Sequence, residues 1–133
     1  MAEPPYQAMP DGIRRPVEWV GSSKNDLRSF PGAVQDHVGF ARYQAQIGLK
    51  HRDAKPMAGI GAGVLEIVSD FDRNTWRAVH AVRFREAVYF LHAFQKKSKR
   101  GIATPKSEIE LVKRRLKLAE QHYEATYGKG PKR

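Results

Sequence analysis

Residues 63–95 read GVLEIVSDFDRNTWRAVHAVRFREAVYFLHAFQ, and this stretch decides the fold. It is rich in β-branched and aromatic residues, which favour strands, and two short polar breaks divide it into three runs. Because the breaks are so short, successive runs are expected to pair as hairpins. The sequence therefore predicts a three-stranded antiparallel meander, with strands over residues 63–71, 75–84 and 87–95.

The middle run of the meander alternates bulky apolar side chains with arginines. Successive side chains of a strand point to opposite faces. This alternation places Trp76 and His80 on one face, and Arg77 and Arg83 on the other. We expect the first face to pack in the core and the second to be a basic surface.

Further elements are expected on both sides of the meander. Alternation over residues 16–20 predicts a short strand, and the capping pattern after it predicts helices over 24–29 and 31–49. The second helix carries a stripe at helical spacing, formed by Val34, Val38, Ala41 and Ala45. Residues 51–63, with several glycines, predict a surface connector. Apolar residues at three- and four-residue steps predict a last helix over about 105–123.

These elements predict one α+β domain. Its antiparallel sheet would consist of the short N-terminal strand and the meander, with an N-terminal helical hairpin and a C-terminal helix. We assign this domain to residues 16–124. Residues 1–15, rich in proline, are expected to form a disordered lead-in, and residues 125–133 a basic tail.

The charge of the chain favours a polyanionic partner. The formal net charge is +10, from 24 Lys and Arg against 14 Asp and Glu. Residues 96–133 hold 12 of the basic residues but only 4 of the acidic ones, so the excess is carboxy-terminal. Such a basic excess suits binding to nucleic acid.

Other classes of protein are disfavoured. The chain has no cysteine, which excludes disulfides and thiolate metal sites, and His-x-Glu metal spacing and a phosphate-binding loop are also absent. The start lacks the features of a secretion signal, and no apolar stretch approaches the roughly 20 residues of a membrane span. We therefore expect a cytoplasmic protein that needs no cofactor and no metal and does not contact a membrane.

Four blocks of sequence carry a family resemblance. They cover residues 65–67, 75–79, 88–98 and 104–110. The most specific block is the aromatic-rich third strand, which runs through His-x-Phe-x-Lys-Lys to Thr-Pro-Lys at residues 104–106. In this order the blocks resemble those of phage-derived HigB-like toxins within the RelE/ParE superfamily, over residues 16–124.

The resemblance implies a RelE-like domain that is the toxin of a type II toxin–antitoxin system. Such a toxin enters the ribosomal A site and cleaves mRNA as a metal-independent endoribonuclease, which inhibits translation. A cognate antitoxin silences it, and in HigB-like pairs this HigA-like partner often carries a helix-turn-helix. The basic charge of the chain agrees independently with an RNA partner.

Metal-free RNA cleavage requires a base, an acid and cations that stabilise the phosphate. Arg77 matches the arginine of a family block and is expected to stabilise the transition state, the alternative being an ion pair with Glu66. Lys96 and Lys97 follow the last strand, where the family tends to carry a basic residue. They would contact the phosphate or transfer a proton, or they would only bind RNA electrostatically.

His92 is the remaining catalytic candidate. It lies within a family block, and a histidine can act as acid or base near neutral pH. However, it shares strand parity with Phe90, which favours a hydrogen-bonded histidine in the core.

Further candidate RNA contacts are Lys55, Arg73, Arg83, Tyr89, Lys99 and Arg100. Lys55 and Arg73 are expected in loops beside the basic face, and Arg83 would extend it. Tyr89 is the best candidate for stacking on a base. For the basic residues, ordinary solvation is the alternative.

Val68 departs from the family pattern. Family members usually carry a basic residue shortly after the glutamate of the first meander strand, where this chain has Val68. An inactive homologue that only binds its antitoxin therefore stays open. Because members of the superfamily share one fold, a ParE-like toxin that inhibits DNA gyrase without cleaving is the other alternative.

Overall fold

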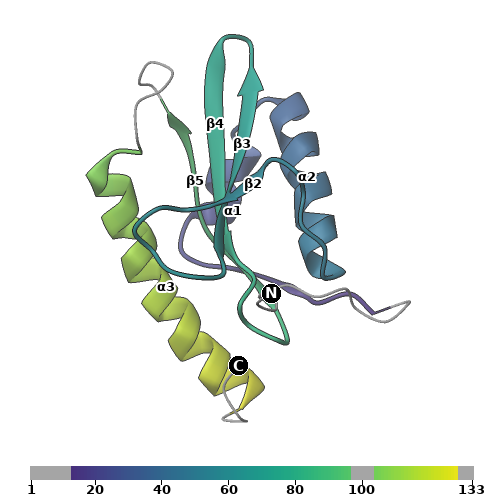
Figure 1. The fold of residues 1–133 in the computed structure, drawn as a ribbon, viewed down its shortest axis with the longest axis vertical. Coiled ribbons are helices and arrows are strands. Elements are labelled where there is room, and N and C mark those ends of the chain that lie inside the picture. Colours follow the sequence, from purple (N-terminus) through teal and green to yellow (C-terminus); the bar gives the residue numbers. More distant parts are fainter. Residues whose placement is uncertain (1–12, 97–103, 129–133) are drawn as a thin grey trace.

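The computed structural model describes residues 13–96 and 104–128. Within them, a five-stranded sheet lies between α2 (Gly32–Gln46) on one face and α3 (Lys106–Tyr127) on the other (Figure 1). The other elements are β1 (Val17–Trp19), α1 (Ser23–Arg28), β2 (Ala54–Pro56), β3 (Val64–Phe71), β4 (Asn74–Ala81) and β5 (Val88–Lys96). The predicted α+β class, with its meander, helical hairpin and C-terminal helix, is confirmed.

The sheet is mixed, whereas the sequence predicted an antiparallel one. Its strand order is β1-β5-β4-β3-β2, and the meander of β3, β4 and β5 is antiparallel as predicted. At one edge β1 runs parallel to β5. At the other edge β2 pairs with β3, within the segment that was predicted to be only a connector. Three residues that end in proline give almost no strand signal in the sequence.

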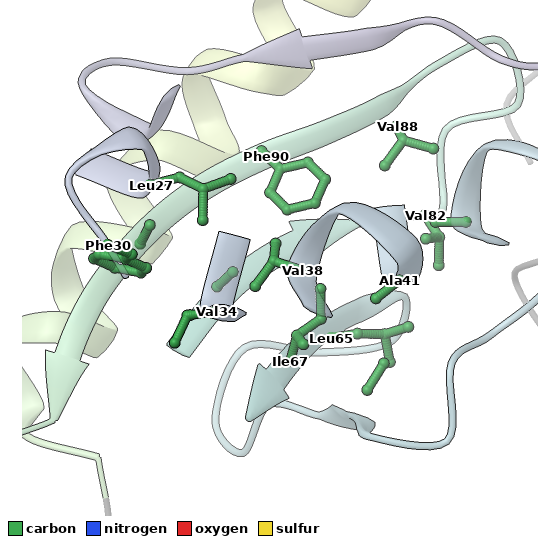
Figure 2. Close-up of a cluster of buried hydrophobic side chains, with 14 residues drawn as sticks. Leu27, Phe30, Val34, Val38, Ala41, Leu65, Ile67, Val82, Val88 and Phe90 are labelled. Carbon is green, nitrogen blue, oxygen red and sulfur yellow. The ribbon is translucent and has the colours of Figure 1, made fainter. Parts of the chain in front are cut away.

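Helices cover both faces of the sheet, so the prediction of one core face and one basic face is wrong. On the side of α2, the predicted stripe is buried, and Val34 packs in a cluster with Phe90 (Figure 2). On the side of α3, Val79 and Ala81 were expected on the basic face but are fully buried in a cluster with Val112. The apolar stripe of α3 requires this partner surface.

A bulge between β4 and β5 changes which residues share a face. Val79 pairs with His92, but the pairing then skips Leu91, which is the extra residue of the bulge. Because facing residues of a ladder point to the same side, His92 lies on the face of Val79 and not on that of Phe90. The predicted parity of His92 with Phe90 is therefore wrong, and His92 joins the face that carries Arg77.

Arg15 belongs to the packed fold, although the sequence placed it in the lead-in. The residue is buried, and its guanidinium donates hydrogen bonds to the carbonyls of Ala45 at 2.6 Å and Phe84 at 2.9 Å. Burial lowers the pKa of Arg15. These carbonyl partners compensate part of the desolvation cost and tie the N-terminal segment to α2 and to the connection after β4.

The last helix is longer than predicted. It continues past Tyr123 to Tyr127, whose hydroxyl donates a hydrogen bond to the carboxylate of Glu18 at 2.6 Å. Burial, together with this carboxylate, raises the pKa of Tyr127 to about 12. Residues 125–127 are thus helical, and Tyr127 contacts β1 through Glu18, so they are not part of a tail. Among the helices of the described ranges, none is long and apolar enough to cross a membrane.

Candidate functional site

Polar side chains gather on the sheet face toward α3, at the end of the meander where β5 finishes. Glu66 on β3 and His92 on β5 lie in one row across the meander, and Arg77 on β4 lies in the next row. Lys96 follows on the same face at the end of β5. We call these four residues, together with Glu108 of α3, the Arg77 cluster.

Glu66 and Arg77 form the centre of the cluster. Arg77 Nη1 donates a hydrogen bond to Glu66 Oε1 at 2.8 Å, and Thr104 Oγ1 donates to Glu66 Oε2 at 3.2 Å. Arg77 Nε is buried and has no hydrogen-bond partner among the residues that the structure describes. The ion pair weighed as the alternative for Arg77 is therefore present, yet it occupies only one of the five N–H donors of the guanidinium.

Lys96 lies close to this ion pair in a desolvated position. The residue is 8% exposed. Burial lowers the pKa of Lys96, the nearby Arg77 lowers it further, and Glu66 acts in the opposite direction. Arg77 and Lys96 thus place two cations beside the carboxylate of Glu66, while the second carboxylate of the cluster, Glu108, pairs with His92. This arrangement suits an anionic ligand such as a phosphate.

His92 is held by a carboxylate from α3. Its Nε2 is hydrogen-bonded to Glu108 Oε1 at 2.7 Å, and its ring stacks on Phe94 with the centroids 4.7 Å apart. Glu108 stands in the first turn of α3. His92 is therefore buried and hydrogen-bonded, which agrees with the alternative of a hydrogen-bonded histidine in the core. An imidazole held by a carboxylate can also transfer a proton.

The other basic candidates are spread over the surface. Lys55 is exposed on β2 and borders the cluster through its pairing with β3. Arg73 is exposed in the β3–β4 turn. Arg83 lies beyond the end of β4 and forms an ion pair with Glu120 of α3, so it does not extend the surface of Arg77. The prediction that Arg77 and Arg83 form one basic surface is wrong, because β4 ends between them.

Tyr89 does not offer a face for stacking on a base. It is 1% exposed, and its hydroxyl is hydrogen-bonded to His122 Nδ1 at 2.7 Å. Burial also raises the pKa of Tyr89. The prediction for Tyr89 is wrong because α3 covers this part of the sheet. Lys97, Lys99 and Arg100 lie outside the described residues.

Two carboxylates of the cluster were not predicted as part of a site. Glu66 was considered only as an ion-pair partner, and Glu108 was not singled out. An acidic residue in the first turn of a helix is ordinarily explained by the helix dipole. The sequence therefore holds no signal that Glu108 meets His92, which depends on how α3 docks.

Comparison with known proteins gives a family match and a structural likeness. Residues 25–117 match the family described as "Phage derived protein Gp49-like (DUF891)". No curated protein matches the chain significantly. Among solved structures, the chain is similar to one in the crystal structure of the toxin–antitoxin complex RelBE2 from Mycobacterium tuberculosis. The identity is 18% and the TM-score 0.42, over 66% of this chain and 98% of that chain.

Proposed function

The chain belongs to the phage-derived Gp49-like family, and on this premise we propose that it is a RelE-type toxin that acts as a ribosome-dependent mRNA endoribonuclease. It would act as the toxin of a type II toxin–antitoxin pair, in the cytoplasm, and inhibit translation. The observation that carries this proposal is the Arg77 cluster, in which two cations and a carboxylate-held histidine share one sheet face.

Cleavage by the 2′-hydroxyl of RNA sets three chemical demands. A base takes the hydroxyl proton, cations stabilise the charge that develops on the phosphate, and an acid protonates the 5′-oxygen that leaves. No metal is needed for these steps. The cluster contains a residue type suited to each of them.

Arg77 is suited to the phosphate. Glu66 holds Nη1 and so orients the planar guanidinium, which carries further N–H groups on Nη1 and Nη2 that can donate to phosphate oxygens. Lys96 adds a second positive charge in a desolvated position, where its interaction with an anion is stronger than in water.

His92 and Glu108 are suited to proton transfer. The carboxylate of Glu108 fixes the imidazole and stabilises its protonated form during transfer. We assign proton transfer to this pair and charge stabilisation to Arg77 and Lys96. The cognate antitoxin would then silence the toxin by covering the cluster with acidic or apolar side chains.

A non-cleaving, ParE-like inhibitor of DNA gyrase is the second candidate. It is favoured by the ion pairing of both arginines, Arg77 with Glu66 and Arg83 with Glu120, which leaves less free positive charge for RNA. Val68 faces Arg77 across the ladder, where the family usually has a basic residue nearby. This apolar neighbour keeps the inactive homologue as a third candidate.

Induced expression in a bacterial host separates these functions. We would follow growth and map reporter mRNA ends by primer extension for the wild type, for Arg77→Ala, and for Arg28→Ala as a matched control. Arg28 is exposed on α1, away from the cluster. Growth arrest with translation-dependent cuts that disappear only in Arg77→Ala is the expected result.

Other outcomes point to the other candidates. Growth arrest with intact mRNA and altered DNA supercoiling would favour the inhibitor of gyrase. Soluble, folded protein that neither arrests growth nor cuts mRNA would favour the inactive homologue.

A further inference from the structure

Two histidines and an aspartate form a second polar cluster on the opposite side of the sheet, next to α2. They are His37 on α2, and His51 and Asp53 in the segment before β2. One ligand atom from each residue lies within 4.8 Å of the ligand atoms of the other two. The cluster is separate from the Arg77 cluster, because it lies on the α2 side.

The contacts within this cluster are well defined. His37 Nε2 lies 2.9 Å from Asp53 Oδ2, and the same carboxylate oxygen lies 3.8 Å from His51 Nδ1. The two imidazole rings meet edge to face at 5.1 Å between centroids. The side chains are partly buried, with exposed fractions of 27% for His37, 11% for His51 and 40% for Asp53. A small ion could therefore reach them from solvent.

Ser69 supports His37 from the sheet. Its hydroxyl is hydrogen-bonded to His37 Nδ1 at 2.7 Å, which fixes the ring and directs Nε2 toward Asp53. The order Ser69, His37 and Asp53 has the appearance of a hydrolytic triad. However, Ser69 is 2% exposed within a strand and cannot meet a substrate. Its role is to position the histidine, as outer partners of metal-binding histidines do.

We propose that His37, His51 and Asp53 bind a divalent transition metal, for which Zn²⁺ is the best fit. Two imidazole nitrogens and one carboxylate oxygen are a ligand set that Zn²⁺ commonly takes. With zinc–ligand bonds of about 2.0–2.1 Å in tetrahedral geometry, ligand atoms lie roughly 3.3 Å apart. The observed separations of 2.9 and 3.8 Å bracket this value.

The hydrogen bonding of His51 is compatible with this role. Its Nδ1 now accepts a hydrogen bond from the backbone N–H of Asp53 at 2.9 Å, and coordination through this atom would replace that bond. Three protein ligands leave a fourth position for water or another molecule.

A bound metal would tie α2 to the edge strand β2. One ligand comes from α2 and two from the connector between α2 and β2, and Asp53 directly precedes β2, which carries Lys55. The sequence predicted no metal site, because the ligands follow no recognised spacing and meet only through the α2–β2 connection.

The test is metal binding by the purified full chain. Isothermal titration with Zn²⁺, and absorption spectroscopy with Co²⁺ as a coloured substitute, should both show one site per chain. His37→Gln, His51→Gln and Asp53→Asn should each weaken binding at least tenfold, and Ser69→Ala about tenfold. His122→Gln serves as the matched control, because His122 lies on α3 and is outside the cluster.

Two further readouts decide whether the cluster is responsible. The melting temperature of the wild type should rise with Zn²⁺ and fall back with a chelator, while the three ligand variants should melt cooperatively but not respond to the metal. The proposal would be overturned by no binding to the wild type, or by Zn²⁺ binding that all three ligand variants retain.

Discussion

Arg77 Nη1 donates a hydrogen bond to Glu66 Oε1 at 2.8 Å, so the arginine assigned to the phosphate is oriented by a carboxylate on the neighbouring strand. The same carboxylate also acts on Lys96, whose pKa it raises against the lowering effects of burial and Arg77. Glu66 is thus linked to both cations of the cluster. A substitution at Glu66 should therefore affect both the orientation of Arg77 and the pKa of Lys96.

Replacing Glu66 with Gln should change both the rate of RNA cleavage and its pH dependence. The guanidinium of Arg77 would lose its orientation, and we expect a loss of about tenfold in rate. Without the carboxylate the pKa of Lys96 falls further. The decrease of the cleavage rate at alkaline pH should therefore begin at a lower pH than in the wild type. The measurement is the pH–rate profile, with Asp36→Asn on α2 as control. If the alkaline limb of the profile does not shift, Glu66 does not act on cleavage through the pKa of Lys96.

His92 and Glu108 should behave as one functional unit. His92→Gln and Glu108→Gln are each expected to reduce cleavage by about 10²-fold, because each removes the proton-transfer pair. The double variant should then be no slower than either single variant, since the function is already lost. A double-mutant cycle on cleavage rates measures this. Strictly additive losses would show that the two residues act independently.

Lys96→Met should stabilise the fold while impairing cleavage. The pKa of Lys96 is lower in the folded than in the unfolded chain, so the charged side chain destabilises the fold at neutral pH. This destabilisation disappears only when the pH exceeds the pKa of Lys96 in the unfolded chain. An apolar side chain of similar length removes this destabilisation, and we expect the melting temperature to rise by about 2–4 °C. Cleavage should fall at least tenfold. A destabilised variant would instead assign Lys96 a structural role.

His80 should make the fold sensitive to acid. It is fully buried and stacked on Phe90 at 5.1 Å, and burial, followed by the charge of Arg15, lowers its pKa from 6.5 to about 3. Between these values the unfolded chain binds a proton that the folded chain excludes. The stability from neutral His80 is thus complete above about pH 6.5 and is lost as pH falls toward 3, by at most about 1.4 kcal/mol per pH unit.

The matching experiment is urea unfolding of the wild type and of His80→Leu from pH 4 to pH 7. Leucine has no titrating group, so this variant should show a flatter dependence of unfolding free energy on pH. His122→Gln, in which a histidine of α3 is replaced, is the control and should keep the wild-type slope. An unchanged slope in His80→Leu would rule out His80 as the source.

The sequence predicted the meander and the helices because their signals are local. The stripe of Val34, Val38, Ala41 and Ala45 and the β-branched runs need no information from distant parts of the chain. Strand β2 was missed because its pairing with β3, and not its composition, makes it a strand. Arg15 was missed because its carbonyl partners lie far away in sequence.

The site could be predicted only in part, for a related reason. Arg77 and Lys96 were singled out and lie close together, whereas the position of His92 depends on the bulge at Leu91. A strict period of two cannot reveal an extra residue, and a bulge reverses the faces of everything that follows it. The contact with Glu108 further depends on the docking of α3, which no local pattern encodes.

Translation-dependent cleavage by purified protein tests the central claim most directly. Wild type, Arg77→Ala and the control Arg28→Ala would be added to a cell-free translation reaction, and the ends of the reporter mRNA mapped by primer extension. We predict discrete cuts with the wild type and with Arg28→Ala, and a loss of about 10²-fold or more with folded Arg77→Ala. Cuts by Arg77→Ala at the wild-type rate would contradict the account.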